Sequence, residues 1–105
     1  MKENTMKSRK FTFISDPGHG WLKVSRADLL KYDVAHLISG YSYMRNNHVY
    51  LEEDIDAATF IRAVEATGVK VLFNEVSSNK QSKIRNYTGF TIATFDFEQL
   101  WPVSV

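Results

Sequence analysis

The sequence predicts an α+β fold, organised as one small domain with a mainly antiparallel sheet of five or six strands and two helices. Three observations lead to this. The chain has 105 residues, a usual size for one domain. Several short apolar segments are separated by turn residues, as in strands. One segment, 57–64, has the apolar spacing of a helix. We expect residues 1–10 to be a flexible N-terminal segment and 11–105 to form the domain.

The first predicted strands are residues 11–14 and 21–24, joined by a turn over 15–20. Proline is favoured at the second position of a type II turn, and glycine supplies the positive φ that the third position needs. Pro17 and Gly18 stand in that order. The segment therefore predicts a type II turn between paired strands.

Two helices follow from capping and spacing signals. Ser25 is a candidate N-cap with Asp28 three residues later, which predicts a helix over 26–32. The second helix begins after a cap at Asp54 or Asp56 and ends near Gly68. Its core stripe is formed by Ala57, Phe60, Ile61 and Val64.

A hairpin is predicted from residues 41–45 and 48–51 around the turn Asn46-Asn47. In this register one face carries Met44, Val49 and Leu51, and the other carries the aromatic and basic side chains. The opposed pairs on that second face are Tyr43 with Tyr50 and Arg45 with His48.

The last third is predicted as a strand over 69–76, a mobile polar loop over 77–89 and a strand over 90–97, with Trp101 packed against the body. The expected core consists of Phe13, Leu22, Leu29, Leu51, Phe60, Ile61, Val64, Val71, Phe73, Ile92 and Phe95.

Composition narrows the function classes. Lys and Arg total 13 and Asp and Glu total 12, so the net charge of +1 does not drive the chain toward nucleic acid or membrane. There are no cysteines, which excludes thiolate metal sites and a Cys nucleophile. No apolar run reaches the roughly 20 residues of a membrane span, and the charged N-terminus does not resemble a signal peptide. We expect a cytoplasmic protein without a membrane partner.

Asp16 and His19 form the most enzyme-like feature, because a carboxylate that orients an imidazole can make it a general base. The same residues also suit a tight turn between two strands. A small enzyme using this pair is kept as one alternative.

Four acids lie close together at Glu52, Glu53, Asp54 and Asp56. Hard cations favour such oxygens, but the run lacks the spacing of an EF-hand, and acids are common at a helix N-terminus. No two histidines have helical metal-ligand spacing. We expect no metal and no cofactor, with these acids capping and solubilising the helix.

Tyr and Arg are enriched at protein interfaces, so the aromatic face of the hairpin is the main candidate for partner binding. The alternative is that another layer of the chain covers that face. The residues predicted to bind the partner are Tyr41, Tyr43, Arg45, His48 and Tyr50, with an acidic rim at Glu52 and Glu53.

A basic loop supports a second alternative, nucleic-acid binding. Lys80, Lys83 and Arg85 lie in residues 77–89, which contain no acid. Convergence of these side chains with the basic N-terminal residues would favour this alternative.

Three segments carry a resemblance to a known group of proteins: SDPGHGWLKV at 15–24, ISGYSY at 38–43 and YLEEDIDAATF at 50–60. They resemble a family of small uncharacterised accessory proteins encoded by phages, plasmids and other mobile elements. Ile55 stands where that family often has Cys. The resemblance implies a mobile-element setting, in which small proteins often inhibit a host defence system. It therefore suggests a non-enzymatic protein that contacts a host protein, such as a defence protein or one that handles nucleic acid.

Overall fold

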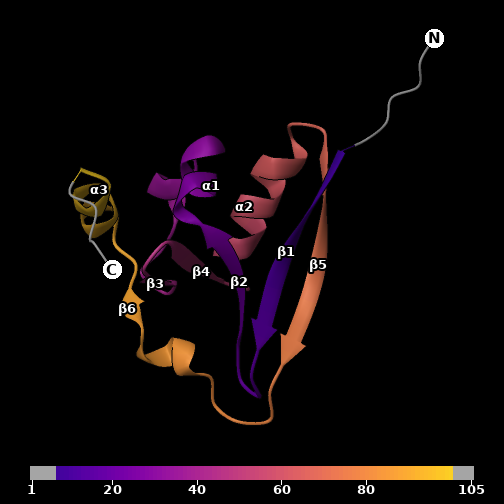
Figure 1. Ribbon diagram of the computed structural model, residues 1–105, viewed down its shortest axis with the longest axis vertical. Helices are drawn as coiled ribbons and strands as arrows, with labels where there is room; N and C mark the ends of the chain where they lie inside the picture. The colour runs from indigo at the N-terminus through magenta and orange to yellow at the C-terminus, as the bar shows by residue number, and fades with distance from the viewer. Residues whose placement is uncertain (1–6, 101–105) are drawn as a thin grey trace.

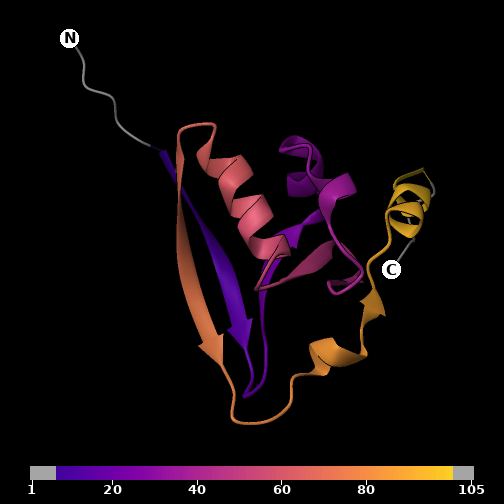
Figure 2. The same ribbon diagram turned by 180° about the vertical axis from the view of Figure 1, so that it is seen from behind.

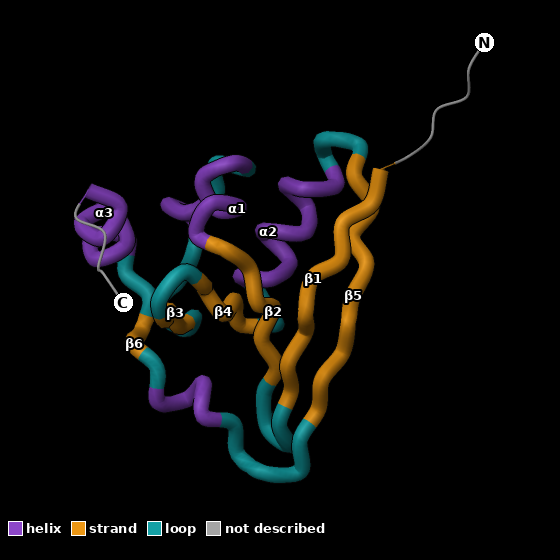
Figure 3. The backbone as a smooth tube through the Cα atoms, in the orientation of Figure 1, coloured by secondary structure: helices purple, strands orange, loops and turns teal. Residues whose placement is uncertain are grey.

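A six-stranded sheet with three helices forms the structure, a computed structural model that describes residues 7–100 (Figures 1 and 3). The strands are β1 (Lys7–Ser15), β2 (Gly20–Ser25), β3 (Tyr43–Arg45), β4 (His48–Glu52), β5 (Val69–Ser77) and β6 (Thr88–Gly89). The helices are α1 (Arg26–Lys31), α2 (Asp56–Glu65) and α3 (Ile92–Leu100), with 3₁₀ turns at Ala35–Leu37 and Lys83–Asn86. The predicted α+β class of a single domain is confirmed.

The strand order is β5-β1-β2-β4-β3-β6, so β5 and β6 form the two edges. Neighbouring strands pair antiparallel, except β1 with β5. That pair is parallel because the chain crosses from the middle of the sheet through α2 before it enters β5 (Figure 3). After β5 the chain passes round one end of the sheet and returns at the opposite edge as β6.

The hairpin β3–β4 has the predicted register, with Met44 opposite Val49, Tyr43 opposite Tyr50 and Arg45 opposite His48. Asn46 in its turn has a φ of 55°, a conformation that Asn adopts more readily than most residues. The register is strongly specified because a slip by one residue would move Met44 and Val49 out of the core.

The main core lies between α1, α2 and one face of the sheet (Figures 1 and 2). At its centre Phe60 is completely buried, and its ring meets the edges of Phe11 and Tyr32 at centroid distances of 5.2 and 5.7 Å. Seven predicted core residues are buried, namely Leu22, Leu29, Leu51, Phe60, Val64, Val71 and Phe95. Phe13 and Ile61 pack partly buried against them.

Two core predictions are wrong, since Phe73 is 43% exposed and Ile92 is 39% exposed. Phe73 lies in β5, an edge strand that lacks a neighbour on its outer side within the described chain. Ile92 lies in α3, where the sequence predicted a strand over 90–97. The β-branched and aromatic residues of this segment favour a strand, but Thr91 begins a helix, because its hydroxyl accepts a hydrogen bond from the Thr94 N–H at 3.1 Å.

The predicted flexible segment is also corrected, because β1 begins at Lys7. Residues 7–10 form strand through their parallel pairing with residues 69–72 of β5. This contact joins positions far apart in the sequence, so the local polarity of 7–10 did not reveal it. The predicted packing of Trp101 lies outside the described residues, as do residues 1–6.

Candidate binding surfaces

The sheet face opposite α1 and α2, here called the back face, carries a second apolar cluster. Strand pairing places Trp21 beside Ile14, and Tyr50 between Lys23 and Tyr43. The 3₁₀ turn of Lys83–Asn86 and the residue after it cover this cluster, whose members are Trp21, Tyr50 and Ile84 with Ile14, Tyr43 and Tyr87 at its margin.

The expected open tyrosine face is therefore corrected. Tyr50 is only 8% exposed, and its ring lies 5.1 Å from that of Tyr87. Its burial raises the pKa of the phenol above the ordinary value. Tyr43 is half-buried, whereas Tyr41 is 78% exposed and lies before the strand. The segment predicted to be a mobile loop thus forms the covering layer of this face.

Arg45 and His48 remain accessible beside that layer. Arg45 is exposed, with its guanidinium 5.1 Å from the centre of the Tyr87 ring. His48 is half-buried, and burial followed by the positive charge of Lys23 lowers its pKa. The structure consequently leaves a cationic surface here, where the sequence predicted an aromatic one.

Asp16 has a structural role in the turn between β1 and β2. Its buried carboxylate accepts hydrogen bonds from Arg85 Nε at 2.8 Å and Nη2 at 2.9 Å. It also accepts them from the backbone N–H groups of Gly18, His19 and Ser82. The pairing with Arg85, supported by these N–H groups, holds the Asp16 pKa well below its usual range. Such a carboxylate stays ionised, and none of its hydrogen bonds goes to the His19 ring.

His19 is instead exposed, with Nδ1 3.2 Å from Arg85 Nη2 and its ring stacked 6.0 Å from Trp21. The predicted type II turn is wrong, because Gly68 is the one described glycine with positive φ. The Asp16 side chain closes the turn through Gly18 and His19, so no left-handed residue is needed.

The acidic segment also forms structure. Glu52 accepts hydrogen bonds from the N–H groups of Asp54, Ile55 and Asp56, so Glu52 caps α2 where Asp54 or Asp56 was predicted. Burial raises the Glu52 pKa, whereas the hydrogen bonds from the three N–H groups and the nearby His19 lower it, and the net shift is downward. Of the predicted acidic rim, Glu53 remains exposed.

Asp56 is completely buried, so the prediction that it solubilises the helix is wrong. Its Oδ2 accepts hydrogen bonds from the Ser39 N–H at 3.0 Å, the Ser39 hydroxyl at 2.7 Å and the Ser42 hydroxyl at 2.6 Å. Ser42 in turn accepts one from the Glu52 N–H at 2.9 Å. This network joins the start of α2 to the connector before β3. Across residues 7–100, no group of three His, Asp or Glu side chains is arranged to hold a metal.

Nucleic-acid binding by the basic loop stays a prediction, but the convergence that would favour it is not observed among the described residues. Lys80 and Lys83 are exposed, but Arg85 is paired with Asp16. The loop follows the end of β5 near Ser15, whereas Lys7 lies at the other end of the same strands. The described N-terminal basic residues and the loop therefore do not converge.

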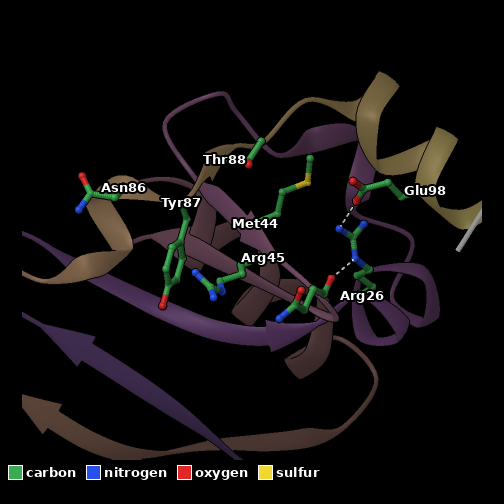
Figure 4. A pocket seen from close by; sticks show the side chains of 8 residues that line it. Arg26, Met44, Arg45, Asn86, Tyr87, Thr88 and Glu98 are labelled. Atoms are coloured by element: carbon green, nitrogen blue, oxygen red, sulfur yellow. Dashed lines mark hydrogen bonds and ion pairs between the residues drawn. The ribbon is translucent and has the colours of Figure 1, made fainter. Parts of the chain in front are cut away.

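Two features were not predicted from the sequence. One is the open outer edge of β5, where Leu72, Phe73 and Val76 are 36, 43 and 48% exposed. An edge position depends on strand order, which no local pattern gives. The other is a polar pocket of about 250 Å³ between the hairpin tip, β6 and α3 (Figure 4). It is lined by Arg26, Met44, Arg45, Asn46, Asn86, Tyr87, Thr88 and Glu98.

Comparison of the chain with protein-family models, with curated proteins and with solved structures finds no match. The resemblance to mobile-element accessory proteins thus depends on its three segments alone. The structure brings these segments together, since β2 pairs with β4 and the Ser42 hydroxyl donates a hydrogen bond to Asp56. No helix within the described chain is long and apolar enough to span a bilayer.

Proposed function

We propose that this chain is a small non-enzymatic binding protein, and that a partner protein binds it by adding a strand to β5. The supporting observation is the outer edge of β5, which is nine residues long and has no neighbouring strand in the described chain. Unpaired backbone groups along an edge strand offer hydrogen bonds to an incoming strand.

The side chains of β5 fit this role. Successive residues alternate between faces, so Leu72 and Val76 lie on the back face and Phe73 on the other. All three are exposed, and an added strand would cover them. Lys70 and Glu75 flank this apolar stretch on opposite faces, so a suitable partner strand has an apolar centre with an acid near Lys70 and a base near Glu75.

A different protein suits this edge better than a second copy. Antiparallel pairing of two copies about a two-fold axis keeps each face of the sheet continuous, so only residues on the same face can lie opposite each other. Lys70 and Glu75 lie on opposite faces and cannot pair in any such register. A foreign strand can supply a counter-charge to each, which supports a heterologous partner.

The class of partner is proposed from the resemblance. In the cytoplasm of a host cell, a phage or plasmid accessory protein of this kind would bind a host protein, such as a defence protein or one that handles nucleic acid. Pairing with its strand would block a surface that this protein needs, so inhibition by protein–protein contact is the proposed outcome.

The test is affinity capture from a host lysate, followed by binding of the purified captured protein to two matched variants. Leu72→Lys with Val76→Lys places two charges on β5, while Leu30→Lys with Leu37→Lys places them on leucines that are 51 and 55% exposed elsewhere. We expect the β5 variant to bind at least tenfold more weakly and the control to bind normally. Hydrogen exchange of the complex should show new protection of the β5 amides.

Unchanged binding by the β5 variant, or protection confined to another segment, would contradict the proposal. Light scattering of the protein alone gives a further check. A dimer that dissociates in the β5 variant would show that a second copy occupies the edge instead.

A further inference from the structure

The back face carries four basic side chains that take no part in an ion pair within residues 7–100. The ion pairs there join Arg9 to Asp28, Arg26 to Glu98 and Arg85 to Asp16. The four basic side chains of the back face are Lys10, Lys23, Arg45 and Lys70. Lys10, Arg45 and Lys70 are exposed and Lys23 is half-buried, so all are accessible to a ligand.

Strand pairing places these charges on one face, on which Glu52 lies farther along β4, opposite Trp21. One row of paired residues crosses the sheet on this face. From β5 to β3 it consists of Asn74, Thr12, Lys23, Tyr50 and Tyr43. Lys10 lies two residues before Thr12 on the same face, opposite Leu72. Beside the basic side chains on the same face lie Ser8, which pairs with Lys70, and Ser25, which pairs with His48. Although the net charge of the chain is only +1, this area is locally cationic.

The four charges extend across the sheet from β5 to β3. Between these strands lie four interstrand gaps of about 4.8 Å, or about 19 Å in total. A span of this length suits several phosphates of an extended strand better than one small anion. The lowered pKa of His48, caused first by burial and then by Lys23, is consistent with positive potential in this area.

The polar pocket lies at the β3 end of this area, and Arg45 belongs to both (Figure 4). In the pocket wall, Arg26 donates from Nε to the Asn46 carbonyl at 2.6 Å and from Nη2 to Glu98. Its buried Nη1 has no partner in the described chain. Amide and hydroxyl groups of Asn86 and Thr88 also line the pocket, which therefore offers donors and acceptors beside the Tyr87 ring.

We propose that the back face binds single-stranded nucleic acid, with phosphates along Lys70, Lys10, Lys23 and Arg45 and one unpaired base in the pocket. An unpaired base can enter a pocket that a paired base cannot reach, which is the reason for choosing a single strand. The charges come from the strands and not from Lys80 and Lys83 of the segment 77–89. The surface shares Lys70 with the proposed β5 edge site, and residues 86–88 line its pocket.

Fluorescence anisotropy with labelled 20-nucleotide dT and rU oligonucleotides tests this. Each phosphate contact on a single strand contributes about 0.7 to the slope of log K against log salt. Four contacts predict a slope of about −2.8 for the full chain. Lys10→Gln with Lys23→Gln should reduce its magnitude by about 1.4, whereas Lys31→Gln with Lys80→Gln, two exposed lysines elsewhere, should leave it unchanged.

Arg45→Lys tests the pocket separately. It keeps the charge but loses the planar contact with Tyr87, so the salt slope should stay the same while the preference for single strands over a matched duplex decreases. Absence of binding at 50 mM salt, or an equal preference for duplex in the full chain, would overturn the proposal. So would loss of binding in the Lys31/Lys80 control alone, or equal binding to phosphatidylglycerol vesicles, which would reveal a general anion surface.

Discussion

Replacing Asp56 with alanine tests whether a buried carboxylate holds α2 in place. The Asp56 carboxylate accepts three hydrogen bonds, from the N–H and hydroxyl of Ser39 and from the hydroxyl of Ser42. Ser42 is completely buried, so its hydroxyl cannot regain a partner from solvent when the carboxylate is removed. Ser39 is half-buried and can be rehydrated in part.

The expected loss in the free energy of unfolding follows from these contacts. A hydrogen bond to a charged group contributes about 1.5–3 kcal/mol, and a buried donor left without a partner costs about 1–3 kcal/mol. Allowing for rehydration of Ser39, we expect Asp56→Ala to lower the free energy of unfolding by about 3 kcal/mol. At an unfolding entropy of about 0.22 kcal/mol/K for a chain of this length, the thermal midpoint falls by about 14 °C.

Two further variants make the test specific. Asp54→Ala removes an exposed acid from the same segment and should change stability by no more than about 0.5 kcal/mol. Asp56→Asn keeps an oxygen at the Oδ2 position and places its amide nitrogen at the Oδ1 position, where the carboxylate has no partner in the described chain. It should therefore lower the free energy of unfolding less than Asp56→Ala does.

Circular dichroism melts and urea unfolding of the three variants provide the measurement, and a double-mutant cycle with Ser42→Ala should show coupling of about 1 kcal/mol. If Asp56→Ala and Asp54→Ala melt within about 2 °C of each other, the reasoning fails. Asp56 would then act as a solvated helix acid, as its sequence context alone suggests.

Three other outcomes follow from the back face and the β1–β2 turn. Asp16→Asn should weaken the contact with Arg85, so limited proteolysis should cut within residues 78–87 sooner than in the unchanged chain. The folded-state pKa of Asp16 is depressed, so its contribution to stability is present above about pH 4 and is lost as the pH falls toward the folded value. In acid titrations the free energy of unfolding should therefore fall less steeply for Asp16→Asn than for the unchanged chain. Tyr50→Ala should destabilise the protein by about 3 kcal/mol and Tyr41→Ala by less than about 0.5 kcal/mol, and similar melts for the two would contradict the covered face.

Local patterns predicted those parts of the fold that depend on nearby residues. Ser25 caps α1 through its hydroxyl, as expected, since the bond to the Asp28 N–H spans only three residues. The reciprocal bond of a capping box is not made, because the Asp28 carboxylate pairs with Arg9 in β1. The register of the β3–β4 hairpin was also predictable, because its two-residue turn and alternating side chains permit one pairing that buries Met44 and Val49.

The failures have two causes. Residues 90–97 have strand composition, but the burial of Phe95 against Phe90 and the cap at Thr91 stabilise a helix. Residues 77–89 are polar and basic, yet Ile84 and Tyr87 cover the back face once Arg85 reaches Asp16. For residues 90–97 a local helix cap outweighed strand propensity, and for residues 77–89 a contact between distant segments did so.

The sequence by itself determined the α+β class, helix α1 with its Ser25 cap, helix α2 and the hairpin, because these follow from hydrophobic period and turn chemistry over a few residues. Only the tertiary structure decided the candidate surfaces. Strand order places β5 at an open edge and brings Lys10, Lys23, Arg45 and Lys70 onto one face. Those positions are up to 60 residues apart in the chain, and their proximity comes from strand pairing, which no local pattern encodes.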